Sequence, residues 1–220
     1  MDLQNYHDIA SDDPSELYDD DFLATSFDCG VGEGGNNSRG RRKESGKHLY
    51  RVSEYARILA LKCGLNLTEA NLVKEASRFH DIGESGVSGA ILNKPGKLNA
   101  EEWELMKSHT KLGYQMLRGS KNPVTEAGSI IALTHHERWD GSGYPHGLSG
   151  SAIPLYGRIA ALADVFDSLT SDRPYKKAVS LEESCSYIYS ERGKHFDPHL
   201  VTQFLESMEP FFCIQRDFAG

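Results

Sequence analysis

The hydrophobic pattern of this chain is helical over most of its length beyond residue 41. In the first such stretch Val52, Tyr55 and Leu59 recur at a spacing that places side chains on one helix face, and the pattern ends near Gly64. Further helical stretches run from Thr68 to about His80, from Asn99 to about His109, from Pro123 to about Leu133, from 155 to 169, from Ser180 onward and from Asp197 onward. Because no stretch alternates apolar and polar residues as a strand does, the sequence predicts an all-α, multi-helix bundle.

The predicted helices begin at residues that commonly cap helix N-termini. Asn99 precedes Glu102 by three positions, and Ser180 precedes Glu183 likewise, which is the spacing of a capping box. The other predicted starts are Thr68 as an N-cap, Pro123 at a first helical position, and Asp197 as an N-cap before Pro198. Irregular insertions are expected between helices, near 83–98 and near 137–154.

The first 40 residues differ in composition from the rest of the chain. They carry ten acidic side chains and one arginine, a charge of −9, whereas the whole chain of 220 residues carries −8, so the other 180 residues total +1. A glycine- and asparagine-rich segment at 30–38 is typical of a linker. We therefore expect a flexible acidic tail at 1–40 and a folded domain at 41–220. A regulatory, partner-binding or scaffold role for the tail is the alternative.

Composition argues against several classes of protein. No run is long and apolar enough to cross a bilayer, and no secretory signal pattern is visible. The four cysteines form no CxxC pair, so neither a thiolate zinc site nor a disulfide framework is indicated; they are Cys29, Cys63, Cys185 and Cys213. We expect a cytoplasmic protein with no membrane and no nucleic acid polymer among its partners. The sequence does not specify an oligomeric state.

Five of the nine histidines lie beside carboxylates or at predicted helix ends, in five clusters. The clusters are Glu44 with His48, His80 with Asp81, His109, His135 with His136, and Asp164. Glu44 and His48 are four positions apart and would share a helix face. Paired imidazole and carboxylate groups are what a hydrolytic centre needs to hold more than one divalent metal, and an all-N/O ligand set suits Fe, Mn or Zn. The pattern therefore predicts a metal centre in the core of the bundle.

Each cluster also has an ordinary structural interpretation. A histidine on an apolar face, as His109 would be beside Trp103 and Met106, is usually a hydrogen-bonded core residue. Asp164 lies in an otherwise apolar helix and needs a partner, which Arg158 could provide. The remaining histidines, His7, His146, His195 and His199, are assigned to surface or capping roles.

Several motifs, in order along residues 44–208, resemble the HD-GYP branch of the HD phosphohydrolases. They are His48 with Arg51-Val52, His80-Asp81-Ile82-Gly83, Lys94-Pro95-Gly96-Lys97-Leu98, His135-His136-Glu137-Arg138-Trp139-Asp140-Gly141-Ser142-Gly143-Tyr144-Pro145, Ile153-Pro154, Ala163-Asp164-Val165-Phe166-Asp167, and Arg173-Pro174-Tyr175-Lys176. The His-Asp pair alone is a weak signal, whereas the combination is highly specific. The resemblance implies a helical HD-type domain and a bacterial phosphodiesterase of cyclic di-GMP, yielding pGpG and then GMP.

The resemblance also implies a metal site with two or three divalent ions, most often iron and alternatively manganese. Carried over by position, the ligands would be Glu44, His48, His80, Asp81, His109, His135, His136 and Asp164. His80 and Asp81 would form the catalytic centre, with Asp81 bridging two metals. Glu44 matches a residue that helps to hold a third metal in trinuclear members, which favours three ions over two.

Other matched positions imply substrate contacts and support of the ligands. Tyr144 would line the pocket and contact the substrate, and Arg173 and Lys176 would bind its phosphates. Asp167 resembles an outer residue that orients a histidine or a positive side chain. Protein partners such as diguanylate cyclases are among those that the family's signalling role implies.

One position departs from the family pattern. Where the family usually continues with lysine after Ile82-Gly83, this chain has Glu84. An acid there replaces a positive charge near a dianionic substrate, which would weaken binding of the transition state. Two alternatives to a cyclic di-GMP phosphodiesterase therefore stay open: a weak or inactive receptor of cyclic di-GMP, and a hydrolase of another cyclic dinucleotide such as cyclic GMP-AMP.

Overall fold

The computed structural model describes residues 46–172 and 177–218, and every regular element within those ranges is helical. The elements are α2 (Gly46–Lys62), α3 (Leu67–Ser77), the 3-10 helix η2 (Ile82–Gly86), α4 (Gly89–Leu92), α5 (Ala100–Lys107), α6 (His109–Leu117), α7 (Pro123–Thr134), the 3-10 helix η3 (Gly150–Ala152), α8 (Leu155–Thr170), α9 (Leu181–Ser190), α10 (Pro198–Leu205) and α11 (Met208–Asp217). Extended pairing in the described part is limited to two isolated bridges. The predicted all-α class is confirmed.

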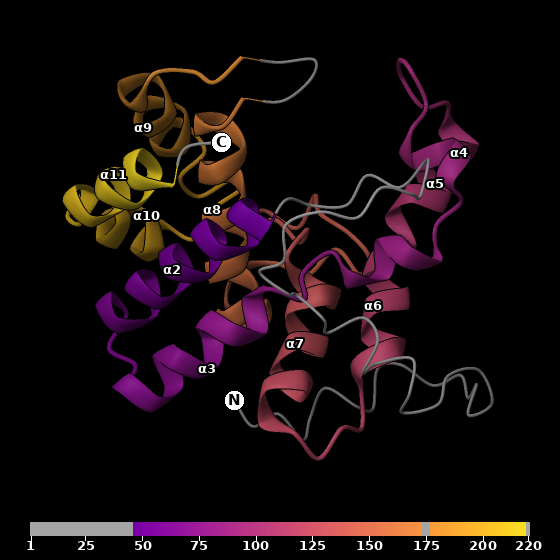
Figure 1. Cartoon of the computed structure of the whole chain (residues 1–220), viewed down its shortest axis with the longest axis horizontal. Coiled ribbons are helices and arrows are strands. Elements are labelled where there is room, and N and C mark those ends of the chain that lie inside the picture. The colour runs from indigo at the N-terminus through magenta and orange to yellow at the C-terminus, as the bar shows by residue number, and fades with distance from the viewer. Residues whose placement is uncertain (1–45, 173–176, 219–220) are drawn as a thin grey trace, which may run out of the picture. The chain divides into compact units, whose positions relative to one another are not determined.

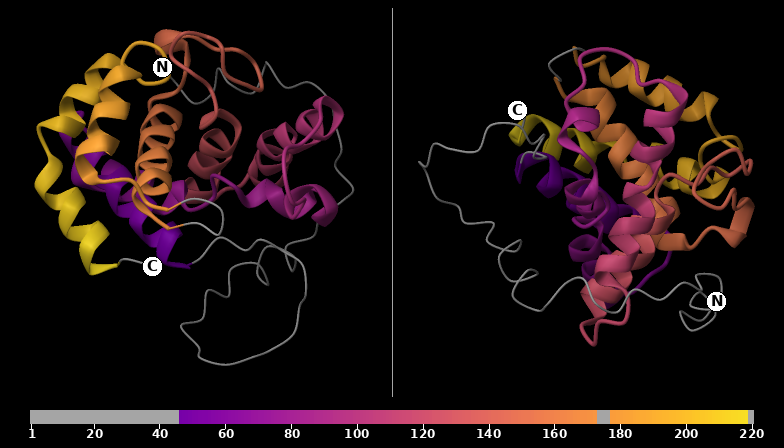
Figure 2. Two further views of the ribbon diagram at one scale, coloured as in Figure 1. Left: turned by 90° about the horizontal axis from the view of Figure 1, so that it is seen from above. Right: turned by 90° about the vertical axis from the view of Figure 1, so that its right-hand side faces the viewer.

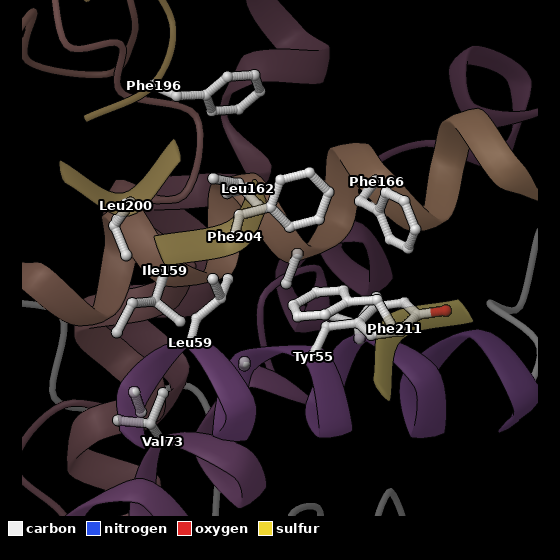
Figure 3. Close-up of a cluster of buried hydrophobic side chains, with 14 of the residues drawn as sticks. Tyr55, Leu59, Val73, Ile159, Leu162, Phe166, Phe196, Leu200, Phe204 and Phe211 are labelled. Carbon is white, nitrogen blue, oxygen red and sulfur yellow. The ribbon is translucent and has the colours of Figure 1, made fainter. Parts of the chain in front are cut away.

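The larger part of the core lies where α2, α8, α10 and α11 meet (Figure 3). Tyr55 of α2 stacks on Phe211 of α11 with ring centroids 4.9 Å apart, and it meets the edge of Phe166 of α8 at 5.1 Å. All three side chains are fully buried, and each such burial contributes about 1.5–3 kcal/mol. This packing fixes α2 against α8, the two helices that carry His48 and Asp164.

A second set of close contacts joins the 3-10 helix η2 to α6 through glycine. A β-carbon on Gly83 would collide with the carbonyl oxygen of His109, and one on Gly113 would lie 2.9 Å from the β-carbon of Ala132 on α7. Only glycine permits this approach. The turn that carries Asp81 is thereby held against the start of α6, and α6 in turn packs closely on the C-terminal half of α7.

The helices are arranged in a row from one side of the domain to the other. In Figures 1 and 2, α9, α10 and α11 lie on one side, α8 and α7 lie in the middle, and α4 and α5 lie beyond α6 on the opposite side. The segments that carry the predicted ligands therefore meet in the middle of the row, where α2, the α3–η2 junction, α6, α7 and α8 approach one another.

Most predicted helix starts are confirmed, and two details are wrong. Asn99 with Glu102 and Ser180 with Glu183 form capping boxes, and the Asp197 side chain accepts from the His199 amide at the start of α10. The cap of α3 is Asn66 rather than Thr68, because Asn66 forms the capping box with Glu69. The predicted helix beyond Asn99 is two helices, since α5 ends at Lys107 and α6 begins at His109.

Some predictions concern parts of the chain outside the described residues, namely the acidic tail at 1–40, Cys29 and the segment around Arg173. The other three cysteines, Cys63, Cys185 and Cys213, are free thiols of intermediate burial. Among the helices described, none combines the length and the apolar character needed to traverse a lipid bilayer.

Candidate metal centre

Seven of the predicted ligands come together in two adjacent groups. Asp81, His109, His135 and His136 form the first group, and His48, His80 and Asp164 form the second. Within each group, one ligand atom from every residue lies within 4.8 Å of all the others. The eighth predicted ligand, Glu44, is outside the described residues. Residues spread over more than 100 positions of sequence therefore converge at one place in the fold.

The two groups meet at Asp81. Its Oδ1 atom lies 3.2 Å from Nε2 of His109 and 3.2 Å from Nε2 of His135, both in the first group. Its Oδ2 atom lies 3.6 Å from Nε2 of His80, in the second group. Each carboxylate oxygen of Asp81 therefore faces a different group.

The ligand atoms of the second group are separated by distances that suit an ion between them. Oδ1 of Asp164 lies 3.7 Å from Nε2 of His48 and 3.9 Å from Nε2 of His80. These distances exceed ordinary hydrogen bonds. Two ligands bonded at ~2.1 Å to one ion lie roughly 3.0–3.4 Å apart, so a small inward shift would complete coordination. The donor set therefore fits a divalent metal.

Backbone carbonyl groups orient three of the histidines. Nδ1 of His80 donates to the Ser77 carbonyl at 2.9 Å, Nδ1 of His109 donates to Met106 at 2.7 Å, and Nδ1 of His135 lies 3.1 Å from two carbonyls of α7. A carbonyl can only accept, so Nδ1 carries a proton in each ring and Nε2 is the atom that faces the centre. The helix ends thus turn the Nε2 atoms toward one another.

His48 is oriented by a carboxylate instead. Its Nδ1 atom lies 2.7 Å from Oδ2 of Asp167, and Arg51 donates to both oxygens of that carboxylate at 2.6 and 2.9 Å. All three side chains are buried. Burial alone would raise the pKa of Asp167, but the hydrogen bonds from His48 and Arg51 outweigh it and hold the pKa below its ordinary value.

The surroundings favour an ionised Asp81 and a neutral His136. Burial opposes ionisation of Asp81, but the field of His80 and the hydrogen bonds to His109 and His135 hold its pKa well below the ordinary value. Burial and the neighbouring His135 hold the pKa of His136 well below its ordinary value, so this ring is neutral. Ionised carboxylates and neutral imidazoles are the forms that bind metal.

The predicted substrate residue Tyr144 lies directly on the first group. Its ring stacks on His136 with centroids 4.8 Å apart, and it lies 6.5 Å from His109. Burial, followed by the charges of Asp81 and Asp164, raises the pKa of the Tyr144 phenol. The side chain is therefore neutral and suited to packing against a substrate.

Glu137 has a structural role that the sequence did not reveal. This buried acid accepts from the amides of His146 and Leu148 at 2.8 and 3.0 Å, so it holds the glycine-rich loop folded back on itself. The Tyr144 amide also donates to the His136 carbonyl at 3.1 Å. An acid directly after two adjacent histidines and before a glycine-rich turn was the available signal.

The structure places the remaining predicted residues as follows. Glu84 lies in η2 and is half-buried. Burial lowers the pKa of His109, but Asp81, with a smaller contribution from the charge of Glu84, raises it above its ordinary value. Arg173 and Lys176 are outside the described residues. Arg158, offered as an ordinary partner of Asp164, instead pairs with Asp197 at 2.5 Å, because it points toward the start of α10.

Two further interpretations are wrong. Trp103 does not face inward as His109 does, because its side chain is 46% exposed and the two residues lie on different helices, α5 and α6. His195 is half-buried rather than exposed: its ring stacks on Phe196 at 4.2 Å, and burial lowers its pKa to about 4.

Known proteins resemble this chain over the region that carries these motifs. Residues 36–200 match the HD domain family, and the chain belongs to it. The chain is 43% identical, over 82% of its length and 34% of the relative, to the 3′3′-cGAMP-specific phosphodiesterase 2 of Vibrio cholerae. It is 46% identical, over 71% of its length and 42% of the relative, to the cyclic di-GMP phosphodiesterase response regulator RpfG of Xanthomonas campestris.

A third relative and a solved structure are similar to the same part of the chain. The chain is 44% identical to a cyclic di-GMP phosphodiesterase of Thermotoga maritima, over 76% of its length and 45% of the relative. A solved cyclic GMP-AMP phosphodiesterase of V. cholerae shares the fold with a TM-score of 0.58 at 24% identity, covering 77% of this chain and 47% of that one. The chain spans about a third to just under half of the length of these curated relatives. The resemblance to the HD-GYP branch is confirmed, and family and ligand cluster together indicate a divalent-metal site.

Proposed function

We propose that this chain is a metal-dependent phosphodiesterase that hydrolyses a cyclic dinucleotide, with cyclic di-GMP as the first candidate substrate. The position of Asp81 between the two ligand groups is the single observation that carries the proposal. Similar proteins are cyclic di-GMP phosphodiesterases or 3′3′-cGAMP-specific phosphodiesterases by name. In the reaction, water adds across one P–O3′ bond, which leaves a 5′-phosphate and a free 3′-hydroxyl in linear pGpG. A second hydrolysis would give GMP.

In the proposed ligand set, each of the two groups would hold one ion. His109, His135 and His136 would hold one ion, His48, His80 and Asp164 would hold the other, and Asp81 would contact both. Divalent ions held there would neutralise charge on the phosphate and activate the attacking water. We expect iron, alternatively manganese, and a third ion if Glu44 joins the second group.

The protein side chains around the ions would bind and orient the substrate. Tyr144 would pack against the nucleotide rather than transfer a proton, because its raised pKa makes the phenol a weak acid and leaves no phenolate to act as a base. Arg173 and Lys176 are proposed to bind the phosphates. The fixed orientation of His48 by Asp167 would keep its Nε2 atom aimed at the second ion.

The experiment that tests the proposal is hydrolysis of cyclic di-GMP by protein purified without oxygen and loaded with Fe(II) or Mn(II). Chromatography should show linear pGpG, and Asp81→Ala should abolish its formation while the helical circular dichroism persists. Intact cyclic di-GMP after prolonged incubation with metal-loaded protein would contradict the proposal.

Two other functions are separated by the same assay. The 43% identity to a 3′3′-cGAMP-specific enzyme favours including 3′3′-cyclic GMP-AMP, and a higher kcat/KM for it would reassign the substrate. The acid at Glu84 favours a receptor without turnover. Tight binding of cyclic di-GMP by metal-loaded protein with no product would establish the receptor.

A further inference from the structure

An exposed indole extends a line of rings away from the proposed metal ligands. Trp103 is 46% exposed, although large aromatic side chains are mostly buried on average. Its ring lies 6.0 Å from that of Tyr144, edge to face at 78°. Tyr144 in turn stacks on His136. The line His136–Tyr144–Trp103 therefore runs from the first ligand group to the surface on α5.

A positive charge lies beside the same rings. Lys107 follows Trp103 by four positions on α5, so both side chains leave the same face of the helix. Its Nζ atom lies 5.8 Å from the Tyr144 ring centroid and 2.8 Å from Oε1 of Glu104. The Glu104 side chain is 71% exposed, and an ion pair with a group so accessible to solvent is weak. A phosphate oxygen can therefore compete with Glu104 for Lys107.

The chemistry of the proposed substrate calls for contacts of this kind. A cyclic dinucleotide has two purine bases and two phosphates, and only one phosphate can lie at the reacting centre. Proteins bind the bases of nucleotides by stacking them on exposed aromatic rings, and they bind phosphates with lysine and arginine. An exposed indole next to an ammonium group, adjoining the residue proposed to contact the substrate, supplies both.

We propose that Trp103 and Lys107 form a subsite for the half of the cyclic dinucleotide that is not being cleaved. The indole of Trp103 stacks on the purine, and Lys107 pairs with the phosphate of that half. This inference rests on the proposed function and adds the position of the second nucleotide. Because neither side chain is among the ligands of the two groups, the subsite governs substrate affinity rather than the chemical step.

Kinetics with two substrates test this assignment. Trp103→Ala should raise KM for cyclic di-GMP about tenfold and Lys107→Met about fivefold, with kcat within twofold of wild type. Hydrolysis of bis(p-nitrophenyl) phosphate, which carries no purine, should be unchanged in both variants. An equal loss on both substrates would show a structural effect and would overturn the subsite, as would an unchanged KM for cyclic di-GMP.

Two other exposed side chains serve as controls. Leu105, 56% exposed, lies two positions after Trp103 on α5, where a side chain points about 200° away. Lys111 is an exposed lysine on the next helix, α6. Leu105→Ala and Lys111→Met should leave both parameters unchanged. A KM increase in these controls equal to that of Trp103→Ala would contradict a specific contact.

Fluorescence gives a second readout that does not need turnover. The chain has two tryptophans, Trp103 and Trp139. Stacking of guanine should quench Trp103, so cyclic di-GMP should quench the emission of metal-loaded Trp139→Phe and leave that of Trp103→Phe unchanged. Quenching without any hydrolysis would support the subsite and contradict the proposed enzyme. Hydrolysis with no quenching in Trp139→Phe would support the proposed enzyme and contradict the subsite.

Discussion

Nδ1 of His48 lies 2.7 Å from Oδ2 of Asp167, one helical turn beyond Asp164 on α8. The same helix therefore provides both a proposed ligand and the group that orients another ligand from α2. Arg51 completes the arrangement by pairing with the Asp167 carboxylate. The geometry of the second ligand group thus depends on a buried ion pair outside the group itself.

Asp167→Asn tests this dependence. The amide keeps the size of the side chain but removes the charge, so His48 loses its strong acceptor and Arg51 its counter-ion. We expect metal affinity of the second group to fall about 10- to 100-fold and the free energy of unfolding to fall by about 3 kcal/mol. Metal titration and urea unfolding would measure the two effects. Asp217→Asn, which alters an exposed ion pair with Arg216, is the control and should change neither.

Substitutions of Tyr144 distinguish a packing role from a role in proton transfer. Its pKa is raised by burial, so the phenol stays protonated at neutral pH. We expect Tyr144→Phe to keep kcat/KM for the cyclic dinucleotide within about threefold, and Tyr144→Ala to lower it tenfold or more through lost stacking. A pH–rate profile of Tyr144→Phe should match that of the wild type. The loss of a basic limb in that profile would assign the phenol a role in proton transfer.

The approach of Gly83 to His109 predicts a substitution that damages the centre indirectly. In Gly83→Ala the new methyl group would collide with the His109 carbonyl and push η2, with Asp81, away from α6. Overpacking of this kind costs about 1–3 kcal/mol of unfolding free energy. We expect that loss together with weaker metal binding. Gly46→Ala, where an added β-carbon meets nothing within 4 Å, is the control, and a stability loss equal to that of Gly83→Ala would argue against this explanation.

Glu84→Lys tests the departure from the family pattern. A positive charge in η2 would remove the repulsion between Glu84 and an anionic substrate and would add an attraction. We expect kcat/KM for cyclic di-GMP to rise about tenfold, a modest fraction of what a well-placed charge contributes to a transition state. Glu84→Gln, which only removes the charge, should give a smaller rise. Unchanged kinetics in both variants would show that this position does not limit the reaction.

The lowered pKa of His195 predicts that the stability of the fold depends on pH through a group outside the metal centre. Its folded-state pKa is about 4, mainly because of burial, against about 6.5 when unfolded. Between those values the unfolded chain binds more protons, so the free energy of unfolding falls as the pH drops from about 6.5 to 4. We expect this histidine to contribute about 1–3 kcal/mol of that fall. Urea unfolding of His195→Gln should show a smaller loss over this window, and the exposed His199→Gln should show the full loss.

The sequence predicted the elements of the fold well where local signals coincide. At Asn99 and at Ser180 an N-cap, an acid three residues later and a helical apolar pattern agree, and both starts are correct. At α3 the same signal is present in Asn66 and Glu69, and it marks the helix start better than Thr68 does. The sequence shows no clear signal for the end of α5 at Lys107, so the prediction places Trp103 and His109 on one helix although they lie on two.

The spatial arrangement of the site is not contained in such local patterns. The resemblance implied which residues approach one another and that Asp81 lies between two ions, whereas the distances from its two oxygens to each group come only from the structure. Nor could the resemblance show that Arg158 points to Asp197, because that pairing depends on how α8 packs against α10.

The most direct test of the two-group centre is the metal content of the intact protein purified without oxygen, compared with Asp81→Ala. The bridging position of Asp81 predicts at least two equivalents of iron or manganese per chain in the wild type and a clear loss in the variant. A folded wild-type protein that holds less than one equivalent after loading, or an Asp81→Ala protein that holds as much as the wild type, would contradict it.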